Sequence, residues 1–351
     1  MNETFDLLKL ALLPETRPQT LRELRARGGV RELLEHPQDH SDLLSQAARA
    51  LLASGAARQR AEVEARRAAE LGVRIVGLDE PDYPHLLREI HDPPFVLYVR
   101  GSLIASEGPR SIAIVGSRAA SPEGCALAHA MARDLAAAGV TVVSGLARGI
   151  DSAAHGGALA AGGRTVAVLG SGIDQLYPPE NGRLAERIVE SGALVSEFPL
   201  GTGARPRNFP RRNRVIAGWG RAVVIAQAAL RSGALVTARC ALDEGRDVLA
   251  VPGHPAHEAS AGTNQLIIDG APLVRNAADV AREVGLAVEV DERDVGDVDG
   301  ILGVLRSDAP ASIEEIQQRC GRSTSELLAR LTELEMAAKV RRLPGPLFIR
   351  Q

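Results

Sequence analysis

The sequence has few cysteines and no long hydrophobic run. Its three cysteines, Cys125, Cys240 and Cys320, lie far apart and form no CxxC pair. This spacing argues against a disulfide framework and against a structural zinc site, and it fits a reducing compartment. The N-terminal stretch carries acidic residues early and contains no apolar segment long enough for a signal peptide or a membrane span. We therefore expect a cytoplasmic protein.

Lysine is almost absent. Of the 41 lysine and arginine residues only Lys9 and Lys339 are lysine, and the formal net charge is −3. Genome base composition accounts for the bias itself. A chain with this charge is not drawn to nucleic acid as a whole, so an anionic partner must be held by a local patch. There, phosphates would meet planar guanidinium groups that can bind two oxygens at once.

Several enzyme signatures are also missing. The sequence has no GxSxG, no P-loop and no paired carboxylates of the two-metal nuclease type. The first strand–helix turn reads "GSRAAS" instead of GxGxxG, and no acidic residue closes the second strand, which argues against NAD and FAD. Asp151 with His155, and His254 with His257, lack the further ligand of a metal site, so we interpret them as a helix-capping aspartate and surface histidines. We expect no cofactor, no metal and no enzymatic activity.

Periodicity divides the chain into several regions. Residues 1–75 have apolar side chains at helical spacing and resemble a SAM-like, helix-hairpin-helix-like module, although a plain helical bundle fits equally well. Residues 76–285 alternate apolar strands with helices, which predicts an α/β fold with a doubly wound, mostly parallel, extended Rossmann-like sheet. Residues 286–297 form an acidic linker. Residues 298–351 have the helix and strand order of a winged-helix domain.

Glycine and polar residues follow several of the predicted strands. In a doubly wound sheet, ligands bind at the carboxyl ends of the strands, where helix N-termini present free N–H groups. The residues at these turns are Gly116, Ser117 and Arg118, then Ser144, Gly145 and Arg148, and later Arg231, Ser232 and Gly233. Such a row of turns with arginines attached fits a polyphosphate backbone better than one compact nucleotide.

Residues 201–220 contain five arginines and one phenylalanine but no acidic residue. Their glycines and prolines predict a long loop that runs into a helix near residues 212–217. A basic loop with an aromatic side chain is typical of single-stranded nucleic-acid binding, where a groove holds the backbone and a ring stacks on a base. In the alternative interpretation some arginines pair with carboxylates such as Glu197 or Asp151, and Phe209 fills the core.

The arginines of this segment divide between these two interpretations. Arg214 adjoins the apolar run "VIAG", which favours a structural ion pair. Arg207 and Arg211 favour contact with a ligand.

Eight motifs in series resemble the DNA-processing protein A family (DprA, also called Smf). They run from "IAIVGSRAASPEG" and "VVSGLARGIDSAAHGGAL" through "GSGIDQLYPPEN", "SEFPLG", "NFPRRNRVIAG", "SGALVTA" and "VPGHP" to "GTNQLIIDGA". The resemblance implies a sequence-independent, non-enzymatic single-stranded-DNA binder that acts as a recombination mediator in natural transformation. It also implies protection of incoming strands, help in loading a RecA-type recombinase past single-strand-binding protein, and dimerisation through the Rossmann-like domain.

The resemblance also implies where DNA binds. The family pocket combines the arginine after the first strand with the basic and aromatic segment before the Arg–Asn pair. Together with the neighbouring turns, the predicted DNA contacts are Gly116, Ser117, Arg118, Ser144, Gly145, Arg148, Arg205, Arg207, Asn208, Phe209, Arg211, Arg212, Arg231, Ser232 and Gly233. Leu266 and Ile267 are candidates for the dimer contact or for the core. Gln227 stands where the family often has glutamate, which removes a charge beside the pocket.

Two other functions would leave signatures in the sequence. A nucleotide phosphoribohydrolase of the LOG type shares a related scaffold, but the PGGxGTxxE signature with its catalytic glutamate is absent. A transcription regulator led by the winged helix would need a basic recognition helix, and "STSELLARLTELEM" carries little positive charge. Although Arg341 and Arg342 lie on the predicted wing, a protein contact fits this domain as well as DNA binding.

Overall fold

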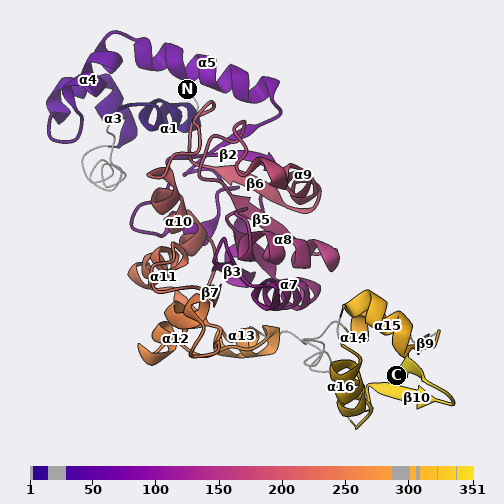
Figure 1. The fold of residues 1–351 in the computed structure, drawn as a ribbon. Coiled ribbons are helices and arrows are strands. Elements are labelled where there is room, and N and C mark those ends of the chain that lie inside the picture. The colour runs from indigo at the N-terminus through magenta and orange to yellow at the C-terminus, as the bar shows by residue number, and fades with distance from the viewer. Residues whose placement is uncertain (1–2, 15–28, 287–300, 306–308, 322, 337) are drawn as a thin grey trace. The chain divides into compact units, whose positions relative to one another are not determined.

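The computed structural model describes residues 3–14, 29–286, 301–305, 309–321, 323–336 and 338–351. They belong to two compact units, Met1–Val290 and Asp291–Gln351 (Figure 1). The predicted acidic linker lies outside the described residues from residue 287 onward, and so does the first helix of the predicted N-terminal hairpin.

Helices open the first unit. Its N-terminal part contains α1 (Glu3–Ala11), α3 (Val30–Glu35), η1 (Pro37–His40), α4 (Gln46–Ala53) and α5 (Ala56–Glu70). Helix α1 contacts strands β1 and β2, and its Leu7, Leu8 and Leu10 are buried in the same core as the sheet. Burial of these apolar side chains ties the helices to the α/β part of the unit.

One eight-stranded sheet organises this unit. Its strands are β1 (Arg74–Gly77), β2 (Val96–Gly101), β3 (Ser111–Gly116), β4 (Thr141–Ser144), β5 (Thr165–Val168), β6 (Ala193–Ser196), β7 (Ala222–Gln227) and β8 (Asp247–Ala250). The order is β1-β2-β6-β5-β4-β3-β7-β8, with parallel pairing from β6 to β8 and antiparallel pairing at β2 and β1. The predicted doubly wound, mostly parallel sheet is confirmed. Strand β3 is the switch point, because the chain continues to β4 on one side and reaches β7 on the other.

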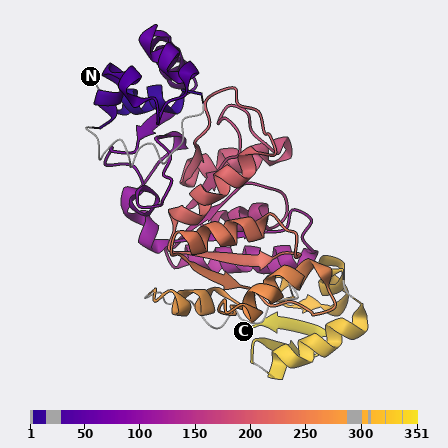
Figure 2. The same ribbon diagram turned by 90° about the vertical axis from the view of Figure 1, so that its left-hand side faces the viewer.

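Helices cover both faces of the sheet (Figure 2). They are α6 (His85–Arg88), η2 (Ala105–Arg110), α7 (Pro122–Ala137), α8 (Ile150–Ala160), η3 (Pro179–Asn181), α9 (Gly182–Ser191), α10 (Asn208–Trp219), α11 (Ala234–Asp243), η4 (Glu258–Ser260), α12 (Ala261–Ile268) and α13 (Ala277–Glu283). Helices α7, α8 and α13 pack on the face that carries Ile112 and Ile114, whereas α10 and α11 belong to the core around Ala113 and Val115. Because successive side chains of β3 point to opposite faces of the sheet, the strand contributes to an apolar core on each face.

Helix α10 begins earlier than the sequence predicts. The predicted loop was expected to reach residue 212, but the helix starts at Asn208 and includes Pro210 in its first turn. Proline is tolerated there because the N–H groups of the first turn have no partner within the helix. The helical period then turns Asn208, Arg212 and Ile216 toward the sheet and leaves Arg211 outside.

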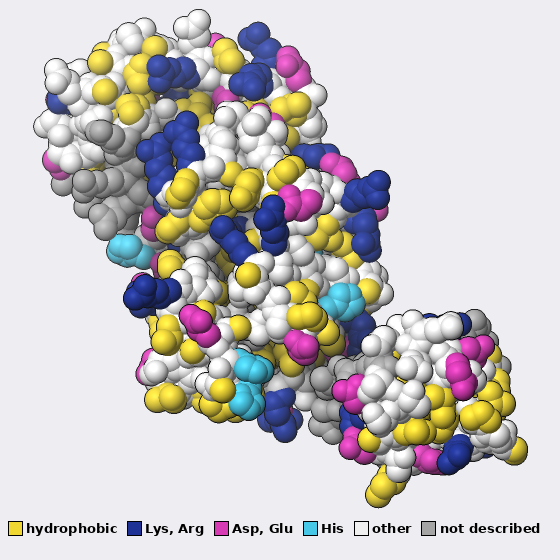
Figure 3. All heavy atoms as spheres, in the orientation of Figure 1, with side chains coloured by type: hydrophobic (Ala, Val, Ile, Leu, Met, Phe, Trp, Pro, Cys, Tyr) yellow, Lys and Arg dark blue, Asp and Glu magenta, His cyan; other side chains and the backbone are white. Residues whose placement is uncertain are grey.

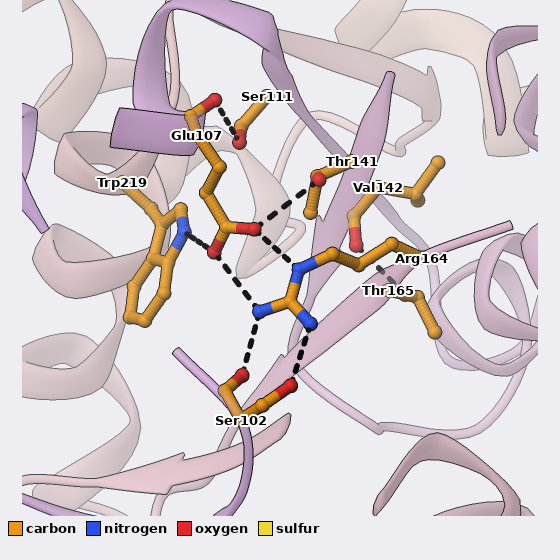
Figure 4. Close-up of polar contacts among 8 residues, drawn as sticks. All are labelled: Ser102, Glu107, Ser111, Thr141, Val142, Arg164, Thr165 and Trp219. Carbon is orange, nitrogen blue, oxygen red and sulfur yellow. Dashed lines mark hydrogen bonds and ion pairs between the residues drawn. The ribbon is translucent and has the colours of Figure 1, made fainter. Parts of the chain in front are cut away.

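A buried polar network fixes the far end of α10 (Figure 4). The carboxylate of Glu107 accepts from the indole Nε1 of Trp219 at 3.3 Å and pairs with Arg164, which also donates to the carbonyl of Ser102 at 2.6 Å. Thr141 donates to the same carboxylate at 3.3 Å. These groups lie near the amino ends of the strands, so the network holds α10 at the edge opposite its first turn.

The second unit has a winged-helix fold. It contains α14 (Ile301–Val304), β9 (Ala311–Ser312), α15 (Ile313–Cys320), α16 (Thr324–Met336), β10 (Val340–Leu343) and β11 (Leu347–Arg350), with strand order β10-β11-β9. Leu327, Leu331 and Phe348 belong to a core of its own. In neither unit do the described residues form a helix that is both long and apolar enough to cross a membrane.

Candidate nucleic-acid interface

A cavity of about 710 Å³ opens at the carboxyl end of β3. The turn after β3, the first turn of α10 and the first turn of α11 line it, including Gly116, Arg118, Phe209 and Gly233. This is the place where a doubly wound sheet binds ligands, and the volume lies within the usual range for a ligand pocket.

Arg118 and Phe209 form the centre of this site. The guanidinium carbon of Arg118 lies 4.7 Å from the centroid of the Phe209 ring, a cation–π arrangement. The ring of Tyr177 lies on the other flank, 6.0 Å from that of Phe209 and tilted by 56°. A Cβ atom added at Gly170 would come within 2.9 Å of the Phe209 ring, so this glycine allows the ring to rest against the backbone. The half-buried Phe209 is held in place and still faces the cavity.

Arg212 is buried beneath the cavity, unlike the exposed arginines around it. Its side chain was predicted to contact DNA, but the residue is only 4% exposed and its Nη1 donates to the carbonyls of Gly145 at 2.7 Å and Val168 at 2.6 Å. The early start of α10 explains the difference, because position 212 falls on the buried face of the helix. Through these two hydrogen bonds Arg212 holds α10 against the carboxyl ends of β4 and β5.

A buried carboxylate accompanies Arg212. Asp151 accepts from the backbone N–H groups of Gly145 at 3.1 Å and Ala147 at 3.3 Å. Burial raises the pKa of Asp151, and the guanidinium of Arg212 opposes that rise. Burial also lowers the pKa of Arg212 to about 10, which still leaves it charged at neutral pH. The two charges compensate each other, so the positive field of the cavity comes from the exposed arginines.

Two of the predicted roles around α8 need correction. Asp151 is not the N-cap of α8, since Gly149 holds that position, and its carboxylate instead holds the preceding loop. His155 is fully buried rather than a surface residue, and its Nδ1 lies 2.7 Å from the hydroxyl of Thr165. Burial lowers the pKa of His155 to about 3, so the ring is neutral. His254 and His257 are exposed, as predicted.

Arg214 has the structural role that the sequence favours. Its Nε donates to Asp92 at 3.0 Å and its Nη2 to Glu197 at 2.6 Å, and its side chain is mostly buried. Glu197 also lies 3.8 Å from the guanidinium of Arg211, which is itself largely exposed. The prediction of an ion pair with Glu197 is confirmed for Arg214.

The structure sorts the remaining predicted contacts by exposure. The larger cavity is lined by Gly116, Ser117, Arg118, Phe209, Arg212, Ser232 and Gly233, and a smaller neighbouring cavity by Gly145 and Arg148 together with Arg118 and Phe209. Arg205, Arg207, Arg211 and Arg231 are exposed but outside both linings. Ser144 and Asn208 differ from expectation, because both are buried and bond to the carbonyls of Ile114 and Gly203.

Gln227 holds the loop that carries Arg118. Its Oε1 accepts from the N–H of Ser121 at 2.8 Å, and its Nε2 donates to the hydroxyl of Ser121 at 3.2 Å. Its backbone carbonyl accepts from the N–H of Ser117 at 2.8 Å. The amide both donates and accepts here, whereas an ionised glutamate can only accept.

Tyr177 is an aromatic site residue that the predicted set omits. It lines both cavities and approaches Phe209, although it lies some thirty residues earlier in the chain. Its position in the turn after β5, at the same edge of the sheet as Arg118, was the available signal. An isolated tyrosine in a proline-rich turn has no periodicity that would single it out.

The surface around the site is basic and partly apolar. Figure 3 shows Lys and Arg side chains beside hydrophobic ones over the part of the first unit where Figure 1 places α10 and β5. Within the described ranges no cluster of three or more His, Cys, Asp or Glu side chains is arranged to hold a metal ion. Fold and site together define a Rossmann-like protein with an arginine-rich, aromatic pocket at the switch point of its sheet.

The chain belongs to a known family. Residues 74–285 match the family model of DNA recombination-mediator protein A, and residues 294–346 match that of the DprA winged helix domain. Protein Smf of Escherichia coli is 38% identical over 284 residues, which are 77% of this chain and 76% of that protein. DNA processing protein DprA of Streptococcus pneumoniae is 43% identical over 201 residues, 57% of this chain and 71% of that protein. The predicted family is confirmed.

Solved structures agree with this assignment. The X-ray structure of DprA from Streptococcus pneumoniae superposes with a TM-score of 0.68 at 32% identity, covering 81% of this chain and 98% of that one. The structure of DprA from Helicobacter pylori, described in terms of its single-stranded DNA binding mode, gives a TM-score of 0.55 at 28% identity over 62% of this chain and 98% of that one.

Proposed function

We propose that this protein binds single-stranded DNA without reading its sequence and acts as a recombination mediator in natural transformation. The observation that carries the proposal is the stacked pair of Arg118 and Phe209 at the switch point of the sheet. The Helicobacter pylori relative, whose structure is described by its single-stranded DNA binding mode, supports the same ligand class.

The pocket and its surroundings combine exposed positive charge with an aromatic surface. Exposed guanidinium groups of Arg205, Arg207 and Arg211 surround the entrance to α10, where they can track a phosphate backbone. Phe209 presents a half-buried ring on which a base of any identity can stack. A duplex keeps its bases stacked on each other, so the ring favours a single strand.

We propose a binding role without catalysis. Asp151 is the only carboxylate among the residues that line the two cavities, and its Oδ2 accepts from two backbone N–H groups, those of Gly145 and Ala147. A carboxylate engaged in this way is poorly placed to act as a general base.

Further roles follow from the family resemblance and belong to the proposal. They are protection of the incoming strand, loading of a RecA-type recombinase past single-strand-binding protein, and a homodimer that involves Leu266 and Ile267. Both side chains are partly buried, and Leu266 packs against the core, while the adjacent Ile268 is 76% exposed. We also propose residues 1–75 and 76–285 as separate domains within the first unit.

An equilibrium binding experiment tests the central part of this proposal. A labelled mixed-sequence single strand and its duplex are titrated with the protein at the same salt concentration, and both DNA and nucleoside triphosphates are assayed for hydrolysis. We expect the single strand to bind much more tightly than the duplex and no hydrolysis. Equal affinity for both forms, or turnover of either substrate, would refute the proposal.

A further inference from the structure

Two cavities meet at Phe209. The smaller one, of about 280 Å³, lies beside the larger and is lined by the turns after β3, β4 and β5. Arg118, Tyr177 and Phe209 appear in both linings, so these three side chains form a shared wall. The cation–π contact of Arg118 and the tilted aromatic pair keep the wall together.

The smaller cavity has the composition of a site for a flat ring with a charge at its edge. Phe209, Tyr177 and Pro178 supply apolar surface, and the backbone of Gly145 and Gly170 lines it without side chains. Arg118 and the exposed Arg148 stand in the same lining, the latter in an ion pair with Glu180. The volume lies just below the range of drug-sized pockets, which suits one small unit.

Tyr177 packs against Phe209 but leaves much of its own ring open to solvent. Of the three tyrosines in the chain, Tyr83 and Tyr98 are fully buried, whereas Tyr177 is 46% exposed. A large aromatic ring left open beside a cavity and next to a second ring is the arrangement that stacks bases in single-strand binders.

We propose that Tyr177 is a second base-stacking residue, and that the smaller cavity takes the base next to the one stacked on Phe209 in the larger cavity. This inference deepens the proposed function and rests on it. The strand crosses the shared wall, and Arg118 meets the phosphate between the two bases. The site therefore binds a dinucleotide step.

Fluorescence of 2-aminopurine tests the proposal, since its emission is quenched when the base stacks on an aromatic ring. Single strands with one 2-aminopurine at successive positions are bound to the wild-type protein, to Tyr177→Ala and to Tyr177→Phe. Ile104→Ala is the matched control, because Ile104 is 45% exposed and lies ahead of β3 at the opposite edge of the sheet.

We expect Tyr177→Ala to relieve the quenching and to weaken binding by about 5- to 150-fold, the range for loss of one stacked base. Tyr177→Phe keeps both properties because the ring remains, and Ile104→Ala changes neither. The dependence on salt stays as in the wild type, since no cation is removed. Circular dichroism checks that the variants are folded.

The outcomes separate this inference from the proposed function. If the wild type binds single strands and Arg118→Ala weakens that binding, while Tyr177→Ala retains wild-type affinity and quenching, only the second stacking site is overturned. If the wild type has no preference for single strands, both fail. A loss with Tyr177→Phe equal to that with Tyr177→Ala would also overturn stacking, because the phenylalanine ring stacks as well.

Discussion

Replacing Arg118 with alanine should weaken DNA binding and make it less sensitive to salt. Arg118 is exposed, lines both cavities and lies over the Phe209 ring. Unlike Arg148 and Arg214, it has no carboxylate partner among the described residues. Its charge is therefore free to meet a phosphate and to release the counterions bound there.

The magnitude follows from the arginines that surround the pocket. Arg118, Arg205, Arg207 and Arg211 are exposed, whereas Arg212 is buried and does not count. Four phosphate contacts predict a slope of about −2.8 for log K against log salt concentration on a single strand, and loss of one predicts about −2.1. Between about 50 and 200 mM salt the wild type should lose affinity about 50-fold and the variant about 20-fold.

Fluorescence anisotropy of a labelled single strand at several salt concentrations measures both slopes. Arg221→Ala is the matched control, because Arg221 is an exposed arginine at the amino end of β7, at the opposite edge of the sheet. It should leave the slope and the affinity unchanged. An Arg118→Ala slope equal to that of the wild type, or an equal loss with Arg221→Ala, would refute the reasoning.

Three further predictions concern stability. Arg212→Met should lower the free energy of unfolding by at least about 2 kcal/mol, because it leaves the buried carbonyls of Gly145 and Val168 without their donor and removes the positive charge that acts on Asp151. In urea denaturation the exposed Arg207→Met should have almost no effect, and similar losses for the two variants would contradict this. Glu107→Ala should lower the free energy of unfolding by about 3 kcal/mol in the same assay, because it leaves Arg164 without its carboxylate and the indole N–H of Trp219 without its acceptor. A loss below about 1 kcal/mol would contradict a stabilising role of the network. The pKa of His155 in the folded protein, about 3, lies below its value in the unfolded chain. The buried neutral ring therefore contributes stability that is fully present above pH 6.5 and is lost as the pH falls toward 3. From pH 7.5 to 5.5 wild-type stability should fall by about 1.4 kcal/mol more than that of His155→Asn, and identical pH dependence would contradict a buried neutral ring.

The sequence predicts the sheet well because its strands are near-continuous apolar runs. The strand at residues 111–116 and the turn that carries Arg118 appear where predicted. Arg214 also has its predicted partner, because an arginine within an apolar run must be neutralised when the run is buried.

The site was less predictable at α10. Glycine and proline in residues 201–210 indicate a loop, but Pro210 fits the first helical turn, so the helix starts four residues earlier than predicted, at Asn208. Arg212 then becomes a buried support instead of a surface ligand. Tyr177 could not be found from local pattern, because only the tertiary fold brings the turn after β5 against Phe209.

Photochemical cross-linking tests the central claim most directly. A single strand that carries 5-iodouracil is irradiated in complex with the wild-type chain, and the tryptic peptides joined to DNA are identified by mass spectrometry. We expect cross-links in peptide 208–211, which contains Phe209, and in peptide 165–183, which contains Tyr177. Cross-links confined to the winged-helix unit, Asp291–Gln351, or to the helices before β1 would contradict it.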